Sequence, residues 1–513
     1  MLVDLKGIFL ISIYMSQILN IKLLRLILLS FILFVIILCV FNPFQPEVST
    51  VSDNITFGEK SLAFAQKSFK LQREKTVRSV ADGNYDNAIK IFTNYLKSKP
   101  NHPEARIFIN NLKVEYPYYT IAVSMQISSN LNGSLEVLHG VPHAQFHGNN
   151  SRLVDSRMLK IAIVVDDDDD PNNSTQIAEE VATELAKTKE ILGVVEHYSS
   201  DTSLPTAKSY QNYQLVSISP IITSVDLIDN TSYFFLTVPS DQAATNALAK
   251  YAQGQLNSLK LVVFYNSDSN YSKFLSQEFI SELGNLNVVL SEYSDCDLAT
   301  WSENLEDWGE KATNVLSKAK RNSANIVILA ISSDYLDQAL ELVRGKKGKL
   351  TIVTGDGIYS AKTIEQSQDN ALKMVVAMPW DIEGGQTNSS FLKRSQEIWR
   401  TSSVSWRAMT AYDATIALRK TISEQTKPNT EGVREKLLLD LSVSGALRKV
   451  NFLDTGDYDV DIQLVEEENI GKRKLEVKFL LDCFQNLGVA LYMVNLFIFL
   501  LTSPSIFGDM VVC

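Results

Sequence analysis

The chain has 513 residues, 45% of them hydrophobic, and a formal net charge of -11. This length and apolar content support two or three domains with real cores. The negative charge repels phosphate backbones, so we expect no nucleic-acid partner. The four cysteines (Cys39, Cys296, Cys483 and Cys513) form no CxxC or Cys/His pair with metal-ligand spacing. We therefore expect no zinc site, no other metal site and no disulfide framework.

The segment 23–41, "LLRLILLSFILFVIILCVF", predicts a membrane anchor. It carries no charge after Arg25 and is about long enough to cross roughly 30 Å of hydrocarbon. Arg25 and the lysines before it are followed by no basic residue until Lys60, so the N-terminus is expected in the cytoplasm and the rest outside. A cleaved signal peptide is the alternative, but no small-residue cleavage site follows the segment. Residues 1–42 are therefore interpreted as a cytoplasmic N-terminus and a single-pass anchor.

A short helical module is predicted after a polar linker over residues 43–60. Within residues 61–115, the stretch "GNYDNAIKIFTNYLKSKPNHPEA" places Gly83, Ala88, Phe92 and Pro100 as in the second half of a tetratricopeptide repeat. One repeat cannot bury both of its faces. We therefore expect a TPR-like helical hairpin that acts as a spacer rather than a peptide-binding module.

From residue 119 to about residue 465 short apolar runs alternate with amphipathic segments. Runs such as "YTIAVSM", "LKIAIVV", "KLVVFY" and "NIVILAI" predict buried strands, with helices such as "YSKFLSQEFISELG" between them. This pattern predicts an α/β fold with doubly wound parallel sheets. The block is roughly twice the size of a usual domain, so two lobes are expected. No GxGxxG or GxxxxGK[ST] motif follows a strand, which disfavours a dinucleotide or P-loop enzyme.

The C-terminal segment, residues 466–513, turns hydrophobic again. Its apolar stretch from Leu487 to Leu501 contains only Asn495 as a polar interruption. This stretch is short for a membrane span. We interpret the segment as a membrane-associating tail, with a second span as the alternative.

Five consecutive aspartates, Asp166 to Asp170, follow the run "LKIAIVV". Neighbouring side chains diverge, so the five cannot all face one ion, and the D-x-D-x-D-G pattern of a calcium loop is absent. The residues after them, "PNNS", are typical of a turn and a helix N-cap. A solvated loop is therefore favoured over a cation site.

Several segments in order resemble the type I periplasmic binding proteins of the leucine/isoleucine/valine group. The stretch "VVEHYSSDTSLPTAKSYQNYQLVSISPIITSVDL" is similar to the ligand-loop region of that family, and "FFLTVPSDQAATNALAKYA" to its crossover between lobes. The segments "VVFYNSDSNYSKFLSQEF", "LTIVTGDGIYS" and "AYDATIALRKTI" continue the match. The phrases "GNYDNAIKIF" and "VSWRAMTAYDA" resemble the cyanobacterial extracellular ligand-binding-receptor branch.

The resemblance implies a two-lobed clamshell over residues 119–465. Its first lobe is expected at about residues 119–239 and 381–447, and its second at about residues 240–380 and 448–465. By this reading the binding domain lies in the periplasm and the chain is held at the inner membrane by the anchor described above.

The resemblance also implies six ligand-binding residues: Ser199, Ser200, Ile221, Thr223, Tyr271 and Asp356. The three hydroxyl residues lie at strand-to-helix turns, where hydroxyls and backbone N–H groups hold a carboxylate well. By resemblance Asp356 binds the ligand's amine, Tyr271 closes over the ligand, and Ile221 makes a backbone contact. Taken singly, each residue is also typical of a turn or a cap.

One departure from the family pattern qualifies the assignment of these ligand-binding residues. The family usually has glycine where Glu196 stands, and a glutamate there could crowd a carboxylate site, so the ligand's identity stays open. Trp380, Trp406 and Tyr412 are expected to serve core or hinge packing rather than to stack on a ligand.

Three functions compete. The first is a solute-binding protein that delivers an amino acid or similar small polar ligand to an ABC permease. The second is a sensor ectodomain that signals through a separate protein. The third is a hydrolase that uses His197 with Ser199 or Ser200, but the G-x-S-x-G elbow and an orienting acid are missing. We therefore predict a binding protein without a cofactor, not an enzyme.

Overall fold

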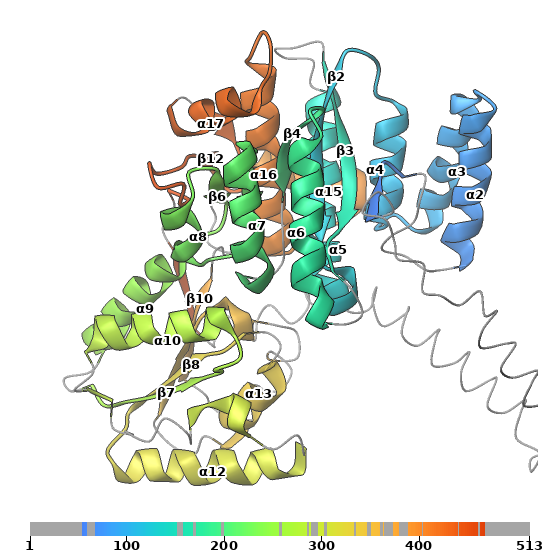
Figure 1. Cartoon of the computed structure of the whole chain (residues 1–513). Helices are drawn as coiled ribbons and strands as arrows, with labels where there is room; N and C mark the ends of the chain where they lie inside the picture. Colours follow the sequence, from blue (N-terminus) through green and yellow to red (C-terminus); the bar gives the residue numbers. More distant parts are fainter. Residues whose placement is uncertain are drawn as a thin grey trace, which may run out of the picture. The chain divides into compact units, whose positions relative to one another are not determined.

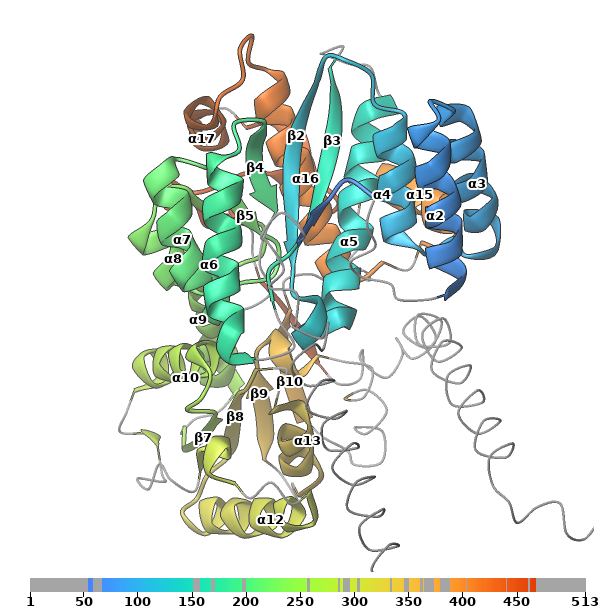
Figure 2. The same cartoon turned by 45° about the vertical axis from the view of Figure 1, so that its right-hand side comes forward.

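The computed structural model describes residues 54–58, 67–150, 157–167, 171–195, 200–255, 259–284, 287–288, 296–301, 305–332, 335–345, 350–359, 363, 373–378, 388–402, 404–439, 441–459 and 462–466. These residues form two main sheets with helices packed on them (Figures 1 and 2). The predicted α/β class with parallel sheets is confirmed.

The first sheet has six strands in the order β1-β3-β2-β4-β5-β6. The strands are β1 (Ile55–Thr56), β2 (Tyr118–Met125), β3 (Met158–Val165), β4 (Ile191–Val195), β5 (Ser217–Ser219) and β6 (Phe234–Leu236). Strands β2 to β6 pair in parallel, and β1 adds an antiparallel edge to β3. Parallel neighbours need long crossovers, and helices supply them here.

Helices cover both faces of this sheet. They are α5 (Ile127–Asn150), α6 (Pro171–Lys187), α7 (Ser200–Tyr213), α8 (Val225–Asn230), α15 (Ser389–Trp399), α16 (Trp406–Ser423) and α17 (Thr430–Leu439). The chain turns back from β3 past β2 to β4, so α5 and the pair α6 and α7 lie on opposite faces. Helix α5 packs along α16, and α6 packs along α7 (Figure 1). The strands can therefore be apolar on both sides.

The second sheet has five strands in the order β13-β10-β9-β8-β7. The strands are β7 (Leu261–Tyr265), β8 (Ile326–Ala330), β9 (Thr351–Thr354), β10 (Lys373–Met378) and the antiparallel β13 (Gln463–Glu466). The surrounding elements are α9 (Asp241–Gln255), α10 (Asn270–Leu283), α12 (Leu305–Arg321), α13 (Leu336–Gly345) and the 3-10 turns η3 (Leu298–Thr300) and η5 (Asp356–Ile358).

Alternate residues of β8 show that this sheet is also covered on both faces. Ile326 and Ile328 join the core formed with α9 and α10. Val327 and Leu329 join the core formed with α12 and α13. Side chains of a strand point alternately to its two faces, so a continuous apolar run is the pattern that two covered faces require.

The chain passes between the two sheets three times: from β6 to β7, from β10 to α15, and from the hairpin of β11 (Val443–Ser444) and β12 (Lys449–Val450) to β13. The third passage is fastened to the first where Leu236 N–H donates to the Gly456 carbonyl over 3.0 Å. Gly456 has φ of 92°, and a Cβ there would lie 2.6 Å from the Phe234 carbonyl oxygen. Only glycine fits this close approach without strain.

Three helices, α2 (Lys67–Ala81), α3 (Tyr85–Ser98) and α4 (Pro103–Leu112), occupy most of the segment in which the sequence predicts a helical hairpin. They share a small core that includes Phe69, Phe92 and Phe108. The Asn84 side chain caps α3 by accepting from Asn87 N–H over 3.1 Å. The likeness of this segment to a tetratricopeptide repeat stays a prediction.

Helix α4 is fastened to the edge of the first sheet through Asn111. The amide of this buried residue donates to the Ile161 carbonyl over 2.8 Å and accepts from Ile161 N–H over 3.0 Å. It also donates to the Phe57 carbonyl over 2.9 Å. The short β1 pairs only with the end of β3, and at Ile161 the Asn111 amide satisfies the peptide groups that β1 leaves unpaired. No flexible connection therefore separates α4 from the first sheet.

The start of the aspartate run does not behave as a solvated loop. Asp166 is fully buried and its Oδ2 accepts from the Ser124 hydroxyl over 3.0 Å. Asp167 is 6% exposed and its Oδ1 accepts from Ile127 N–H over 2.9 Å at the start of α5. The solvated-loop prediction is wrong for these two residues, because one carboxylate accepts from Ser124 on β2 and the other from the first N–H of α5. Asp168, Asp169 and Asp170 lie outside the described residues.

No helix within the described ranges is both long and apolar enough to span a membrane. The predicted anchor at residues 23–41 and the tail from residue 467 onward lie outside those ranges. Both assignments stay predictions.

Candidate functional site

The residues singled out from the sequence fall at the carboxyl ends of parallel strands. Ile221 and Thr223 follow β5, Tyr271 is the second residue of α10 just after β7, and Asp356 opens η5 after β9. Ser200 is the first residue of α7, the helix after β4. Ser199, Glu196 and His197 lie outside the described residues. In open α/β sheets this edge is the usual place for ligands.

Tyr271 and Asp356 are brought into direct contact. The Tyr271 hydroxyl donates a hydrogen bond to Asp356 Oδ1 over 3.2 Å. Gly355 makes room for it, because a Cβ there would lie 2.9 Å from the phenol oxygen. Burial, followed by the charges of Asp356 and Asp241, raises the pKa of Tyr271 well above its usual value. The phenol therefore stays protonated and acts as a donor.

The start of α10 holds Tyr271 in place. Ser269 caps the helix by accepting from Ser272 N–H over 3.3 Å. Ser272 in turn accepts from Asn266 N–H over 2.7 Å and donates to the Ala330 carbonyl at the end of β8. These contacts tie the first turn of α10 to two strand ends, so Tyr271 is carried by a rigid support.

Asp241 is a further candidate site residue, which was not predicted from the sequence. It opens α9, is 2% exposed, and its N–H donates to the Thr223 carbonyl over 2.8 Å. Its Oδ2 has no hydrogen-bond partner among the described residues. Burial raises the pKa of Asp241 well above its usual value, a hydrogen bond with Thr223 opposes this, and the Asp356 charge adds to it. The only sequence signal was "PSD" before a helix, which is typical of an ordinary N-cap.

Arg407 is the second missed residue, and it brings a positive charge from the first sheet's side. It lies in the first turn of α16, where its guanidinium stacks 4.5 Å from the Trp406 ring. Its Nη1 is 3.2 Å from Glu136 Oε2 on α5. Burial raises the pKa of Asp356, and Arg407 is the largest influence that lowers it. Arg407 therefore favours the ionised form of Asp356.

Ile221 and Ser200 are two further residues that the sequence analysis predicted as ligand-binding. Ile221 is half-buried and packs against the cores of both sheets, and its N–H lies 3.4 Å from the Ser219 hydroxyl. Ser200 is placed at the start of α7, but its side-chain environment lies outside the described part. Nearby, Gln126 Nε2 donates to the Thr202 hydroxyl over 2.7 Å and ties the end of β2 to α7.

The site therefore has a distinct chemical character. Thr223 and Asp241 form one contact pair, and Tyr271 and Asp356 form another. The charge of Asp356 adds to the burial that raises the pKa of Asp241. Buried carboxyl groups are costly to ionise unless a positive group pairs with them. The arrangement is suited to a ligand that brings a cationic group such as an ammonium.

Other expectations can be compared with the structure. Trp406 and Tyr412 are buried, as core residues should be, whereas Trp380 lies outside the described residues. Within the described part no group of three or more His, Cys, Asp or Glu residues could hold a metal ion.

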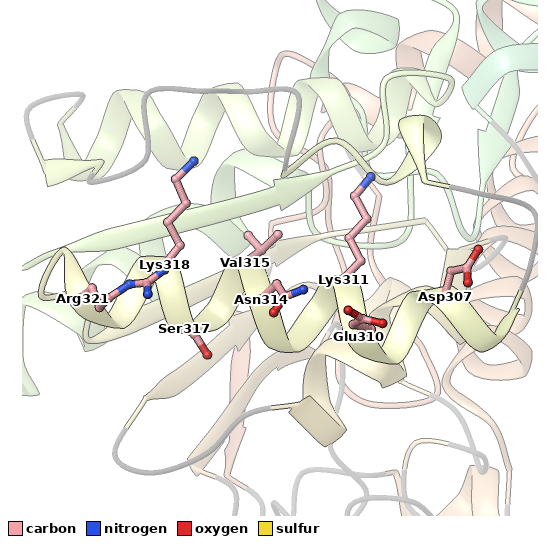
Figure 3. Close-up of a pocket in the computed structure, with 8 residues that line it drawn as sticks. All are labelled: Asp307, Glu310, Lys311, Asn314, Val315, Ser317, Lys318 and Arg321. Atoms are coloured by element: carbon pink, nitrogen blue, oxygen red, sulfur yellow. The ribbon is translucent and has the colours of Figure 1, made fainter.

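A pocket of about 570 Å³ lies elsewhere, along α12, lined by residues from Asp307 to Arg321. Its side chains point to different sides of that single helix (Figure 3). Acids gather in its first half and bases in its last turn, which complements the helix dipole. The pocket therefore lacks the convergent groups of a binding site.

A family model described as periplasmic binding protein matches residues 159–460. The comparison with curated proteins found no match.

Solved structures share the fold at low identity. An ABC transporter substrate-binding protein from Desulfitobacterium hafniense in complex with Leu is 20% identical, with 68% of this chain and 97% of that chain covered and a TM-score of 0.54. The leucine-binding protein LivK from Thermotoga maritima is 16% identical, with 67% and 94% covered and a TM-score of 0.56. A solute-binding protein of an ABC transporter from Rhodopseudomonas palustris in complex with p-hydroxybenzoic acid is 12% identical, with 68% and 92% covered and a TM-score of 0.54.

Proposed function

Because the chain belongs to the periplasmic binding protein family, we propose that it captures an amino acid or a similar small polar ligand by closure of two lobes. Membership in a family of binding proteins agrees with the prediction that the chain is not an enzyme. The proposal is supported above all by one observation, the meeting of Tyr271, Asp356 and Asp241 at the strand ends.

The chemistry of these residues favours an amine-bearing ligand. The structural relatives include one bound to Leu and one bound to p-hydroxybenzoic acid. Both molecules carry a carboxylate, but only the amino acid carries an ammonium. The buried Oδ2 of Asp241 has no hydrogen-bond partner in the described part of the chain, and Asp241 lies near a second acid, Asp356. An ammonium would pair with these groups, whereas a simple aromatic acid would add negative charge beside them.

Lobe closure follows from where the groups reside. Thr223 belongs to the first sheet's strand ends, whereas Tyr271 and Asp356 belong to the second sheet's. A ligand held by both sets stabilises the state in which they are close, and the three chain passages between the sheets allow the change.

Delivery to an ABC permease is the role proposed for this capture, with the domain in the periplasm and the anchor at residues 23–41 in the inner membrane. This part is supported by the apolar segment and by the charge asymmetry around it. A sensor ectodomain that signals through a separate protein is the alternative. Co-purification of the full chain with permease subunits would favour transport, and co-purification with a kinase would favour sensing.

A thermal-shift screen of the full chain tests the binding proposal. Ligands would include the common amino acids, their amides, short peptides and p-hydroxybenzoate, each at millimolar concentration. A ligand that binds only the folded state raises its melting temperature. We expect at least one amino acid to do so and p-hydroxybenzoate not to. Absence of any amine-bearing hit would contradict the proposal.

A further inference from the structure

Three basic side chains meet around Tyr412, away from the ligand-binding residues. Arg394 of α15 donates from Nη2 to the Tyr412 phenol oxygen over 3.3 Å. His147 of α5 places Nδ1 2.7 Å from the same oxygen. Arg419, two turns after Tyr412 on α16, donates from Nη2 to the Gly148 carbonyl over 2.6 Å. Three helices thus bring two guanidinium groups and an imidazole together.

Neither guanidinium in this cluster is neutralised by an acid in the part of the chain that the structure describes. Among the described residues, Arg394 and Arg419 form no ion pair, unlike Arg407, which pairs with Glu136. The Nε atoms of both arginines are buried and lack a hydrogen-bond partner within the described ranges. Buried donors without acceptors cost free energy, which an acceptor with a negative charge would recover.

His147 is the third member of the cluster, and its neighbours keep its imidazole neutral. Burial, then the charges of Arg394 and Arg419, lowers the pKa of His147 to about 4. The imidazole is therefore neutral at pH 7. The Nδ1 atom of His147 is in contact with the Tyr412 phenol oxygen, so Nε2 is the ring nitrogen that would meet a ligand. The charged or titratable groups facing His147 are Arg394 from α15, Arg419 and Tyr412 from α16, and His143 from α5 itself.

The backbone is shaped to keep Arg419 in this position. A Cβ on Gly148 would lie 2.1 Å from Arg419 Nε and 2.3 Å from its Cδ. A larger residue would push the guanidinium away from the end of α5. The cluster also lies well apart from Arg407, because twelve residues of helix separate Arg407 and Arg419, or about 18 Å at 1.5 Å per residue.

We propose that Arg394, Arg419 and His147 bind a small oxyanion, such as phosphate or sulfate, between α5, α15 and α16. Planar guanidinium groups pair well with oxyanions because their N–H donors match two oxygens at once. The anion would pair with the guanidinium groups through their Nη donors and would offset the repulsion between the cations. Through Tyr412 it would also bind the three helices together.

Equilibrium dialysis of the full chain with radiolabelled inorganic phosphate tests the proposal. We expect one saturable site per chain, with sulfate as a competitor. Arg394→Gln and Arg419→Gln should each weaken binding about tenfold or more, the scale expected for removal of a charge-assisted hydrogen bond. Arg344→Gln is the control, because Arg344 pairs with Glu341 on α13 of the second sheet. Absence of saturable binding, or equal weakening by the control, would overturn the proposal.

A second measurement uses the unmutated chain, so that a folding defect in a variant cannot obscure the result. The imidazole C–H resonance of His147, assigned by its loss in His147→Gln, is followed by NMR as phosphate is added. A bound anion favours the charged imidazole, so phosphate should raise the pKa of His147. A His147 resonance that does not respond to saturating phosphate places any bound anion elsewhere and refutes the proposal.

Discussion

The Tyr271 hydroxyl donates to Asp356 Oδ1 over 3.2 Å, which joins the first turn of α10 to the turn after β9. The two residues are 85 positions apart in the chain, yet both follow parallel strands of the second sheet. The contact presents a neutral phenol donor and a carboxylate to the same space. Whatever binds there is met by both groups together.

Removal of either group should weaken amino-acid binding to a different degree. Asp356→Ala should cost about 2–5 kcal/mol, the scale for unpairing a buried charge. Tyr271→Phe should cost about 1 kcal/mol, because it removes a single hydrogen bond. Isothermal titration calorimetry with the best ligand from the screen measures both. The exposed Tyr213 supplies the control, Tyr213→Phe, which should leave affinity unchanged. Equal affinities in Asp356→Ala and the parent chain would remove Asp356 from the site.

The raised pKa of the buried Asp413 leads us to expect that the folded chain loses stability as pH rises. It is 1% exposed, and it accepts from Ala446 N–H over 2.6 Å and from the Tyr458 hydroxyl over 3.0 Å. Burial raises its pKa from 3.8 to about 7, although both hydrogen bonds oppose the shift. Between these values the unfolded chain releases a proton that the folded chain retains, so stability falls as pH rises. One pKa unit corresponds to about 1.4 kcal/mol, so the loss is on the order of 4 kcal/mol.

Asp413→Asn tests this prediction by urea unfolding at pH 4, 5.5 and 7. The variant cannot ionise, so its free energy of unfolding should decline less over this range than that of the parent chain. Asp454→Asn, an exposed change in the neighbouring loop, should keep the parent's decline. A decline in Asp413→Asn as steep as the parent's would mean that Asp413 is not the group that titrates.

His143 predicts the opposite dependence, a loss of stability in acid. Its ring stacks 4.6 Å from Phe391 and is 1% exposed. Burial, with smaller contributions from Arg394 and His147, lowers its pKa from 6.5 to about 3. The unfolded chain takes up the proton first, so stability is complete above pH 6.5 and is lost as pH falls toward 3. His143→Leu should reduce the difference in unfolding free energy between pH 7 and pH 4.5. An unchanged difference would assign the acid sensitivity to other groups.

Gly140 lies where α5 and α16 approach each other closely. A Cβ there would lie 2.1 Å from the Ala408 carbonyl oxygen and 2.7 Å from Tyr412 N. Backbone cannot yield as a flexible side chain can, so Gly140→Ala should destabilise the fold by about 2 kcal/mol or more. Gly254→Ala in α9 meets nothing within 4 Å and should be neutral or stabilise by up to about 1 kcal/mol. Denaturant midpoints of the two variants check the contrast, and similar midpoints would contradict it.

Much of the fold could be predicted because a strand that is buried on both faces has an uninterrupted apolar sequence. The runs "LKIAIVV", "KLVVFY" and "NIVILAI" coincide with β3, β7 and β8 to within one or two residues. Strands β1, β6 and β13 were not predicted. Strands β1 and β6 have only two and three residues. Strands β1 and β13 are antiparallel edges, and each pairs with a strand that is distant in the chain. Short runs with such pairing carry no periodicity that a sequence reading can detect.

The candidate site, too, could be predicted from the sequence only in part. The resemblance and the strand-end positions pointed to Thr223, Tyr271 and Asp356, because parallel strands direct their following turns to one edge. Asp241 and Arg407 escaped notice, because a residue in the first turn of a helix looks like a cap or a surface charge until its neighbours are known.

By itself the sequence determined the class of fold, the ends of the longer parallel strands, and the kinds of side chain available there. The tertiary structure alone decided which of those side chains meet. Tyr271 with Asp356, Asp241 with Thr223, and Arg407 with Glu136 are pairs that local pattern does not encode. The buried Asp166 makes the same point, because its environment is set by Ser124 on the neighbouring strand. Local propensity acts over a few residues, whereas burial and charge pairing act between residues that only the folded chain brings together.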